Sequence, residues 1–121
     1  MKLENQVVSL DLAKRLKEVG VKQESLFVWY TNPWQHKTGL EIRKKAEENL
    51  LVGHADYCAA FTVAELGEML PEDESFRIKH TTGECNIWRD DEVFSGDTET
   101  DARAKMLIYL LENKLISNPA S

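Results

Sequence analysis

The stretch DTETDARAKMLIYLLENKLI, residues 97–116, carries the clearest structural signal in the chain. Acidic residues crowd its start, where they stabilise the positive end of a helix dipole, and Asp97 or Thr98 is placed to cap the first turn. Six consecutive apolar residues, 106–111, fill its centre. A helix that packs against one layer needs only a single apolar stripe. The pattern therefore predicts a C-terminal helix that either lies between two layers or also forms an interface.

Two residues of that apolar run are candidates for contact with a partner. The core-facing residues recur at helical spacing: Met106, Leu107, Leu110 and Leu111. Ile108 and Tyr109 then lie on the flanks, where exposure would create an apolar patch of the kind that soluble monomers limit. Either a second layer of the chain or a partner must cover them. We favour a partner, for which a two-fold homodimer is the commonest arrangement.

A helix and a strand are predicted near the N-terminus. Ser9 can cap the helix, and Gly20 can end it in a left-handed conformation. The apolar stripe of this helix comprises Leu12, Ala13, Leu16 and Val19. The sequence SLFVWY, residues 25–30, is rich in β-branched and aromatic residues over the length of a strand. Both faces of that strand are apolar, so we expect both to be covered, and Trp34 beyond it is the best candidate for an exposed aromatic side chain.

The segment 31–60 contains a first capping-box pattern. In TGLE, residues 38–41, the threonine hydroxyl can accept from an orphan backbone amide and the glutamate can reach back to the start of the helix. We therefore predict a helix that begins here and continues to Gly53, rich in charge and thin in apolar residues. The whole segment is expected to be a variable insertion.

A second capping box lies in FTVAELGEML, residues 61–70. Thr62 and Glu65 hold the box positions, and Phe61 and Leu66 can form a hydrophobic staple. Because proline cannot continue a helix, Pro71 should end it. This pattern predicts a short helix with a well-defined start.

The sequence SFRIKHTTGECNIWRD, residues 75–90, is typical of a β-hairpin. Apolar and polar residues alternate on both sides of a turn at Thr82-Gly83. Arg77 and Lys79 could lie across from Phe27 or Trp29, which would give a small mixed patch. Base stacking needs such cations beside aromatic rings, but the order and signature of an RNA-recognition fold are missing from the sequence.

Charge and length disfavour several classes of function. The chain of 121 residues has 15 basic and 21 acidic residues and a net charge of −6. An acidic surface repels phosphate, so we expect no binding to nucleic acid. No apolar run approaches the roughly 20 residues that span a bilayer, and the N-terminus has no apolar signal core. We therefore expect a cytoplasmic protein that binds no membrane.

Sequence motifs give little support for catalysis or for a cofactor. His54, Asp56 and Cys58 lie close together, but a metal site would need two further ligands at metal-binding spacing. Apolar neighbours of Cys58 should raise the pKa of its thiol, which disfavours a nucleophile. Cys58 and Cys85 are expected to be buried free thiols. No phosphate loop, nucleophile elbow or dinucleotide fingerprint occurs in the sequence, so we predict no catalytic residue, no metal and no cofactor.

Three blocks of sequence resemble one group of proteins. The blocks are LAKRLKEVGVKQESLFVWY, AFTVAELGEMLP and DARAKMLIYLLENKLI, and together they cover roughly half of the chain. They resemble small bacterial proteins of unknown activity that are carried on prophages and other mobile elements. The resemblance implies a bacterial, intracellular protein of mobile-element origin. It implies no activity and no catalytic residue.

The order of these elements predicts an α+β fold in a single domain, residues 1–121. We expect a small antiparallel sheet of about three strands packed against three to four helices. The end of the chain, residues 116–121, is expected to be a frayed tail.

Three functions from different classes are compatible with this pattern. The favoured one is an accessory protein that acts by binding a protein partner, which can be a second copy of itself, through Trp34, Ile108 and Tyr109. The second is a small hydrolase or ligand-binding domain, and its candidate residues are Trp34, His54, Asp56 and Tyr57. A deep pocket that joins those side chains would favour it. The third is an acidic mimic of nucleic acid that inhibits a host enzyme, which would need carboxylates in a phosphate-like row.

Overall fold

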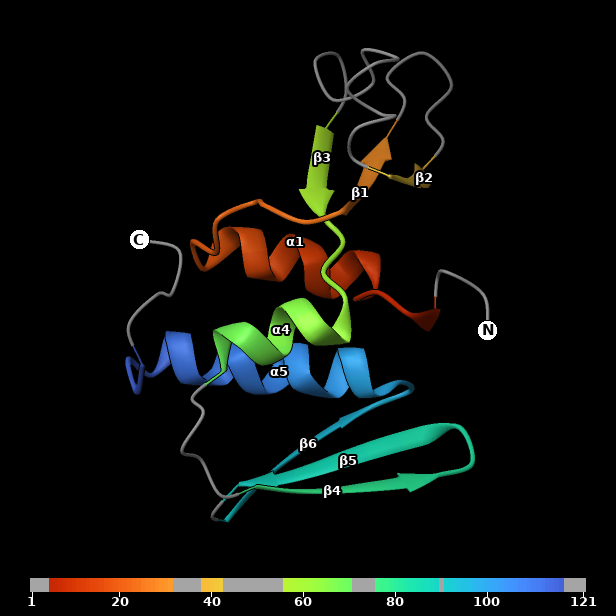
Figure 1. The fold of residues 1–121 in the computed structure, drawn as a ribbon. Helices are drawn as coiled ribbons and strands as arrows, with labels where there is room; N and C mark the ends of the chain where they lie inside the picture. The colour runs from red at the N-terminus through yellow and green to blue at the C-terminus, as the bar shows by residue number, and fades with distance from the viewer. Residues whose placement is uncertain (1–4, 32–37, 43–55, 71–75, 90, 117–121) are drawn as a thin grey trace.

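The computed structural model describes residues 5–31, 38–42, 56–70, 76–89 and 91–116. The described elements are α1 (Leu10–Glu18), β1 (Phe27–Thr31), β2 (Thr38–Ile42), β3 (Asp56–Ala59), α4 (Val63–Met69), β4 (Phe76–Thr81), β5 (Glu84–Arg89), β6 (Glu92–Gly96) and α5 (Glu99–Glu112). They form layers (Figure 1). An antiparallel sheet β2-β1-β3 lies beside α1, helices α4 and α5 follow, and a second antiparallel sheet β4-β5-β6 packs on the far side of α5. The fold is α+β, as predicted, but these ranges contain six strands in two sheets instead of about three strands in one.

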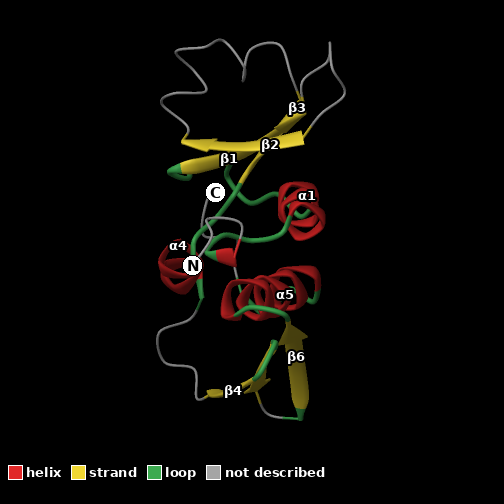
Figure 2. Cartoon of the chain, turned by 90° about the vertical axis from the view of Figure 1, so that its right-hand side faces the viewer, coloured by secondary structure: helices red, strands yellow, loops and turns green. Residues whose placement is uncertain are grey.

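Helix α5 lies between sheet β4-β5-β6 and helices α1 and α4 (Figure 2). Thr98 caps it, because the threonine hydroxyl accepts a 3.2 Å hydrogen bond from the backbone N–H of Asp101. Its buried side chains occur around most of its circumference: Thr100, Ala102, Ala104, Met106, Leu107, Ile108 and Leu110. Packing between layers of the same chain therefore accounts for the apolar run.

The hairpin of sheet β4-β5-β6 is confirmed. Strands β4 and β5 pair around a turn in which Gly83 takes a φ of 76°, a left-handed conformation that glycine adopts without strain. The third strand, β6, was not predicted; it pairs with β5 so that Phe94 lies opposite Ile87. Both side chains are buried, as is Cys85 on the same face. These three residues make up much of the sheet surface that packs on α5.

The helix predicted at TGLE is wrong, because residues 38–42 form strand β2, antiparallel to β1. Glycine destabilises a helix interior, whereas in β2 it makes room for an aromatic neighbour. Gly39 lies opposite Tyr30, and a Cβ at Gly39 would be 2.6 Å from Tyr30 Oη. A capping box reports only local bonds, and here the pairing with β1 decides the structure. The remainder of that predicted helix, up to Gly53, lies outside the described residues.

Helix α1 ends as predicted and begins differently. Gly20 has a φ of 93°, its N–H donates to the carbonyl of Lys17 at 3.1 Å, and the N–H of Val21 donates to the carbonyl of Leu16 at 3.1 Å. This pair of bonds is the Schellman motif. Ser9 occupies the N-cap position, but its side chain makes no capping hydrogen bond, so the predicted capping bond is wrong.

The capping box of α4 is confirmed in both directions. The Thr62 hydroxyl accepts from the backbone N–H of Glu65 at 3.2 Å, and the Glu65 carboxylate accepts from the backbone N–H of Thr62 at 2.8 Å. Phe61 and Leu66, the residues of the predicted staple, are fully buried. Pro71 lies outside the described residues.

One hydrophobic core joins the three described helices to both sheets. Its largest fully buried side chains include Leu16, Phe61, Leu66, Ile87 and Leu107. Val28 of β1 is also fully buried but lies outside this core, while its neighbour Trp29 packs against it. Val28 and Trp29 point to opposite faces of β1, and each is at least half-buried. Leu26, which the prediction placed on the same strand, lies before β1 and is 67% exposed, so the predicted covering of both faces holds only in part. Within the described ranges, no helix has the length and apolar character needed to cross a membrane.

Candidate functional site

The residues predicted for a small catalytic or ligand site are only partly placed. Trp34 and His54 lie outside the described residues. Asp56 begins strand β3, and Tyr57 follows it with a half-buried side chain. In the described part of the chain, no group of three or more His, Cys, Asp or Glu side chains is arranged to hold a metal ion.

Both cysteines are free thiols, as predicted, and both are buried. Cys58 is 5% exposed and Cys85 is 1% exposed. Burial raises the pKa of the Cys85 thiol, and the carboxylate of Glu99 raises it further against the opposing charge of Arg103. The thiolate is the nucleophilic form, so Cys85 is poorly suited to covalent chemistry.

The chain itself covers Ile108 and Tyr109. Ile108 is 8% exposed. Tyr109 is half-buried, and its ring centroid lies 5.3 Å from that of Phe94 on β6. Sheet β4-β5-β6 thus supplies the second layer that the sequence left open, and the apolar run of α5 gives no argument for a homodimer.

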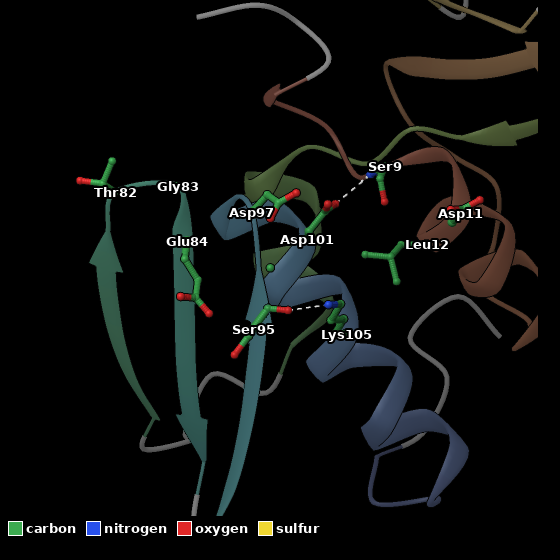
Figure 3. A pocket seen from close by; sticks show the side chains of 11 residues that line it. Ser9, Asp11, Leu12, Thr82, Gly83, Glu84, Ser95, Asp97, Asp101 and Lys105 are labelled. Carbon is green, nitrogen blue, oxygen red and sulfur yellow. Dashed lines mark hydrogen bonds between the residues drawn. The ribbon is translucent and has the colours of Figure 1, made fainter.

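An acidic cleft of about 610 Å³ opens where α1, the β4–β5 turn and β6 meet the start of α5 (Figure 3). Four carboxylates line it: Asp11, Glu84, Asp97 and Asp101. The backbone N–H of Ser9 donates to Asp101 Oδ1 at 2.8 Å, and Lys105 Nζ donates to the Ser95 carbonyl at 2.6 Å. The polar groups of this cleft therefore hold α1 and β6 to α5.

Asp101 in this cleft has a pKa above its ordinary value. Burial raises this pKa, and the nearby Asp97 carboxylate adds to the effect, while the hydrogen bonds from Ser9 and the charge of Lys105 oppose it. A raised pKa is common among catalytic acids. Here Asp101 Oδ1 already accepts the hydrogen bond from the backbone N–H of Ser9 at the start of α1. We therefore assign Asp101 a structural role.

The outer face of sheet β4-β5-β6 is a different kind of surface. Helix α5 packs on the inner face, and the described residues place no element on the opposite side (Figure 1). Alternation along the paired strands puts the following residues outward: Arg77, Lys79 and Thr81 of β4, Glu84, Asn86 and Trp88 of β5, and Val93 and Ser95 of β6. We call this set the outer sheet face.

Trp88 lies on the central strand of the outer sheet face, at the end away from the Gly83 turn. Arg77 and Val93 flank it on the neighbouring strands, and Arg77 Cζ is 6.0 Å from the Trp88 ring centroid. Val93 is 51% exposed. Beside Trp88 is a hollow of about 550 Å³, which Arg77 and Lys79 also line. The outer sheet face therefore combines an aromatic ring, an exposed apolar side chain and two cations.

The two cations of the outer sheet face are not neutralised by the described residues. Arg77 and Lys79 are exposed, and neither forms an ion pair in the described part of the chain. Glu84 is the single carboxylate that the register places on this face, and it lies at the turn end of the sheet, opposite Thr81. On a chain of net charge −6, this is a local basic and aromatic surface.

The mixed patch that Arg77 and Lys79 could have formed with Phe27 or Trp29 does not form, because β1 and β4 belong to different sheets. Arg77 and Lys79 lie opposite Trp88 and Asn86 of β5, not opposite β1. The signal that could have placed them was present, because pairing around the turn at Gly83 sets Arg77 opposite Trp88. The hairpin sequence does not show that the outer face is uncovered, because this depends on which side of the sheet α5 packs.

No family model, curated protein or solved structure compared with the chain matches it. The resemblance to proteins of mobile elements stays a prediction, and function has to be argued from the surface of this chain.

Proposed function

We propose that this protein acts by binding another protein, and that the outer sheet face receives an acidic segment of that partner. One observation carries the proposal: Arg77 and Lys79 lie beside Trp88 on the open face of a sheet in an acidic chain, and no described carboxylate pairs with either of them. An acidic segment would supply the missing negative charge.

The spacing of the cations suits such a segment. Arg77 and Lys79 are two positions apart on one strand, so their side chains leave the same face about 7 Å apart. Two carboxylates of a partner can therefore pair with them at once. Complementary charge favours fast and selective association more than it favours high affinity.

Trp88 and Val93 provide the apolar part of the contact. Tryptophan and arginine are enriched among the residues whose removal weakens protein interfaces most. Trp88 lies between Arg77 and Val93, so an apolar side chain of the partner can pack on the ring while its acids meet the cations. Arg77 and Lys79 lie on the edge strand β4, where cations can also discourage edge-to-edge pairing of sheets. That role alone would not account for Trp88 beside them.

Protein is favoured over nucleic acid as the partner. Binding along a nucleic acid backbone depends on many lysines and arginines that neutralise successive phosphates. The outer sheet face has two cations, and the whole chain has an excess of acids. A short acidic segment with an apolar residue fits this surface better than a long polyanion does.

Titration of the isotope-labelled full chain, followed by NMR, tests the proposal. The probe is a short soluble peptide rich in Glu with single Leu residues, and its control has each Glu replaced by Lys. We expect the acidic peptide to shift the Trp88 indole N–H and the β4 amides in a saturable manner. Arg77→Gln and Lys79→Gln should weaken that binding, whereas Lys14→Gln on α1 should not.

Several results would contradict the proposal. These are equal binding of the basic peptide, shifts that map away from the outer sheet face, and tighter binding of a single-stranded oligonucleotide to the same face. A peptide that shifts no resonance would contradict it as well.

A further inference from the structure

A groove of about 410 Å³ runs between α1 and sheet β2-β1-β3. The lining residues that matter here are Lys14, Lys17 and Glu18 from the helix and Trp29, Tyr57 and Cys58 from the sheet. The volume lies in the range of small-molecule sites. Helices α1 and α5 separate this groove from the outer sheet face (Figure 1), so any ligand here would be independent of the proposed protein contact.

The helix side of the groove is basic. Glu18, the acid at this side, is paired with Arg15 at 3.0 Å. Lys14 has no ion pair or hydrogen bond in the described part of the chain, while Lys17 Nζ donates to the Tyr57 carbonyl at 2.7 Å. Lys14 and Lys17 are three positions apart, which makes them neighbours on one helix face. Their ammonium groups can therefore converge on a single anionic group.

The sheet side of the groove is aromatic, and its rings are held in place. Trp29 is half-buried, and its Nε1–H donates to the Val8 carbonyl at 2.8 Å. Lys17 Nζ lies 4.9 Å from the centroid of the Tyr57 ring, a distance at which a cation is attracted to the ring face. A flat apolar group that enters the groove thus meets two aromatic side chains that are already positioned.

We infer that this groove binds a small organic carboxylate with a flat aromatic body. The carboxylate accepts charge-assisted hydrogen bonds from Lys14 and Lys17, and the aromatic body packs against Trp29 and Tyr57. Both parts are needed, because a bare anion leaves the rings unused and a neutral aromatic compound leaves the two amines unused.

Naphthoate is the probe for this site, and naphthamide is its neutral match in shape. In an NMR titration of the full chain, we expect naphthoate to cause saturable shifts of the Trp29 indole N–H and of the amides of Tyr57 and Cys58. The affinity for naphthamide should be lower than that for naphthoate by a factor of roughly ten or more, as expected for the loss of a hydrogen bond between charged groups.

Lys14→Gln is the sharpest variant, because Lys14 is exposed and has no partner among the described residues whose loss would disturb the fold. It should weaken naphthoate binding roughly ten-fold, and Lys14→Arg should restore the affinity. Lys79→Gln on the outer sheet face is the control and should leave naphthoate binding unchanged. Equal affinity for the acid and the amide, no saturable shift at Trp29, or an unchanged affinity in Lys14→Gln would overturn the site. None of these results bears on the outer sheet face, whose own test depends on Arg77 and Lys79.

Discussion

The backbone N–H of Ser9 donates a 2.8 Å hydrogen bond to Asp101 Oδ1, across a sequence separation of 92 residues. The carboxylate satisfies the backbone N–H of the N-cap residue of α1, while the Ser9 hydroxyl makes no capping bond to the helix. Asp101 also lies in the first turn of α5, so a single side chain ties the first turns of two helices together. This contact helps to fix α1, and with it the sheet β2-β1-β3 that packs on α1, relative to α5.

The raised pKa of Asp101 predicts a dependence of stability on pH. The folded state binds the proton of this carboxyl group more tightly than the unfolded state does, mainly because burial disfavours the charge. Its contribution to stability is therefore present at low pH and is lost as the pH rises through the folded-state pKa, above 3.8. Asp101→Asn keeps an oxygen for the Ser9 N–H and removes the titration.

The test measures denaturant unfolding of the wild type and of Asp101→Asn at a series of pH values from below 3.8 to neutrality. The free energy of unfolding of the wild type should fall relative to that of Asp101→Asn as the pH rises towards neutrality. A difference that is constant with pH, or that changes with the opposite sign, would show that burial does not dominate at this carboxyl group.

The capping box of α4 should contribute measurably to stability. Thr62→Ala leaves the Glu65 amide without its acceptor and should lower the free energy of unfolding by about 1 kcal/mol. Glu65→Ala should cost more, because the Glu65 carboxylate also accepts from the Ser25 hydroxyl at 2.8 Å and from the Leu26 amide at 3.2 Å. Thr82→Ala in the exposed β4–β5 turn is the control. Equal denaturation midpoints for Thr62→Ala and Thr82→Ala would argue against the box.

Two glycines should respond to alanine with opposite signs. A Cβ at Gly96 would lie 2.8 Å from the backbone nitrogen of Ala102, so Gly96→Ala must push β6 away from the first turn of α5 and should lower the melting temperature. A Cβ at Gly67 in α4 would meet nothing within 4 Å, and alanine favours a helix by about 1 kcal/mol over glycine. Gly67→Ala should therefore raise the melting temperature. A shift of the same sign in both variants would contradict the close packing at Gly96.

Cys58 and Cys85 should react slowly with iodoacetamide while the protein is folded. Both thiols are buried, and the raised pKa of Cys85 also lowers its thiolate fraction. Mass spectrometry of the labelled chain should show fast modification only after addition of denaturant. Cys58 is 5% exposed. Its fast labelling under native conditions would mean that the groove between α1 and β3 opens further than this exposure indicates.

Sequence patterns predicted the features that bonds between near neighbours decide. The Thr62–Glu65 box, the end of α1 at Gly20 and the turn at Gly83 are all closed within a few residues, and all three are confirmed. Strands β2, β3 and β6 depend on pairing with β1 or β5, and the sequence did not predict them. TGLE shows the cause, because its local bonds favour a helix while the fit of Gly39 against Tyr30 favours a strand.

The candidate surfaces escaped prediction for a related reason. Lys17 and Tyr57 meet in the groove although 40 positions separate them, and no local pattern reports that α1 packs beside β3. The hairpin did contain the pairing of Arg77 with Trp88. That the resulting face is open follows only once α5 is seen to occupy the other side of the sheet.

Site-specific photo-cross-linking tests most directly whether the outer sheet face is the binding surface. The cross-linking residue replaces Val93, and a matched control replaces Leu115; the two side chains are 51% and 52% exposed. In cells that express the chain from its own gene, Val93 should cross-link to one partner through an acidic peptide, and charge reversal by Arg77→Glu with Lys79→Glu should abolish the product. The account would be contradicted if both positions cross-linked with equal yield, or if the charge reversal left the product unchanged. A cross-link to a peptide without acids, or to a second copy of the chain, would also contradict it.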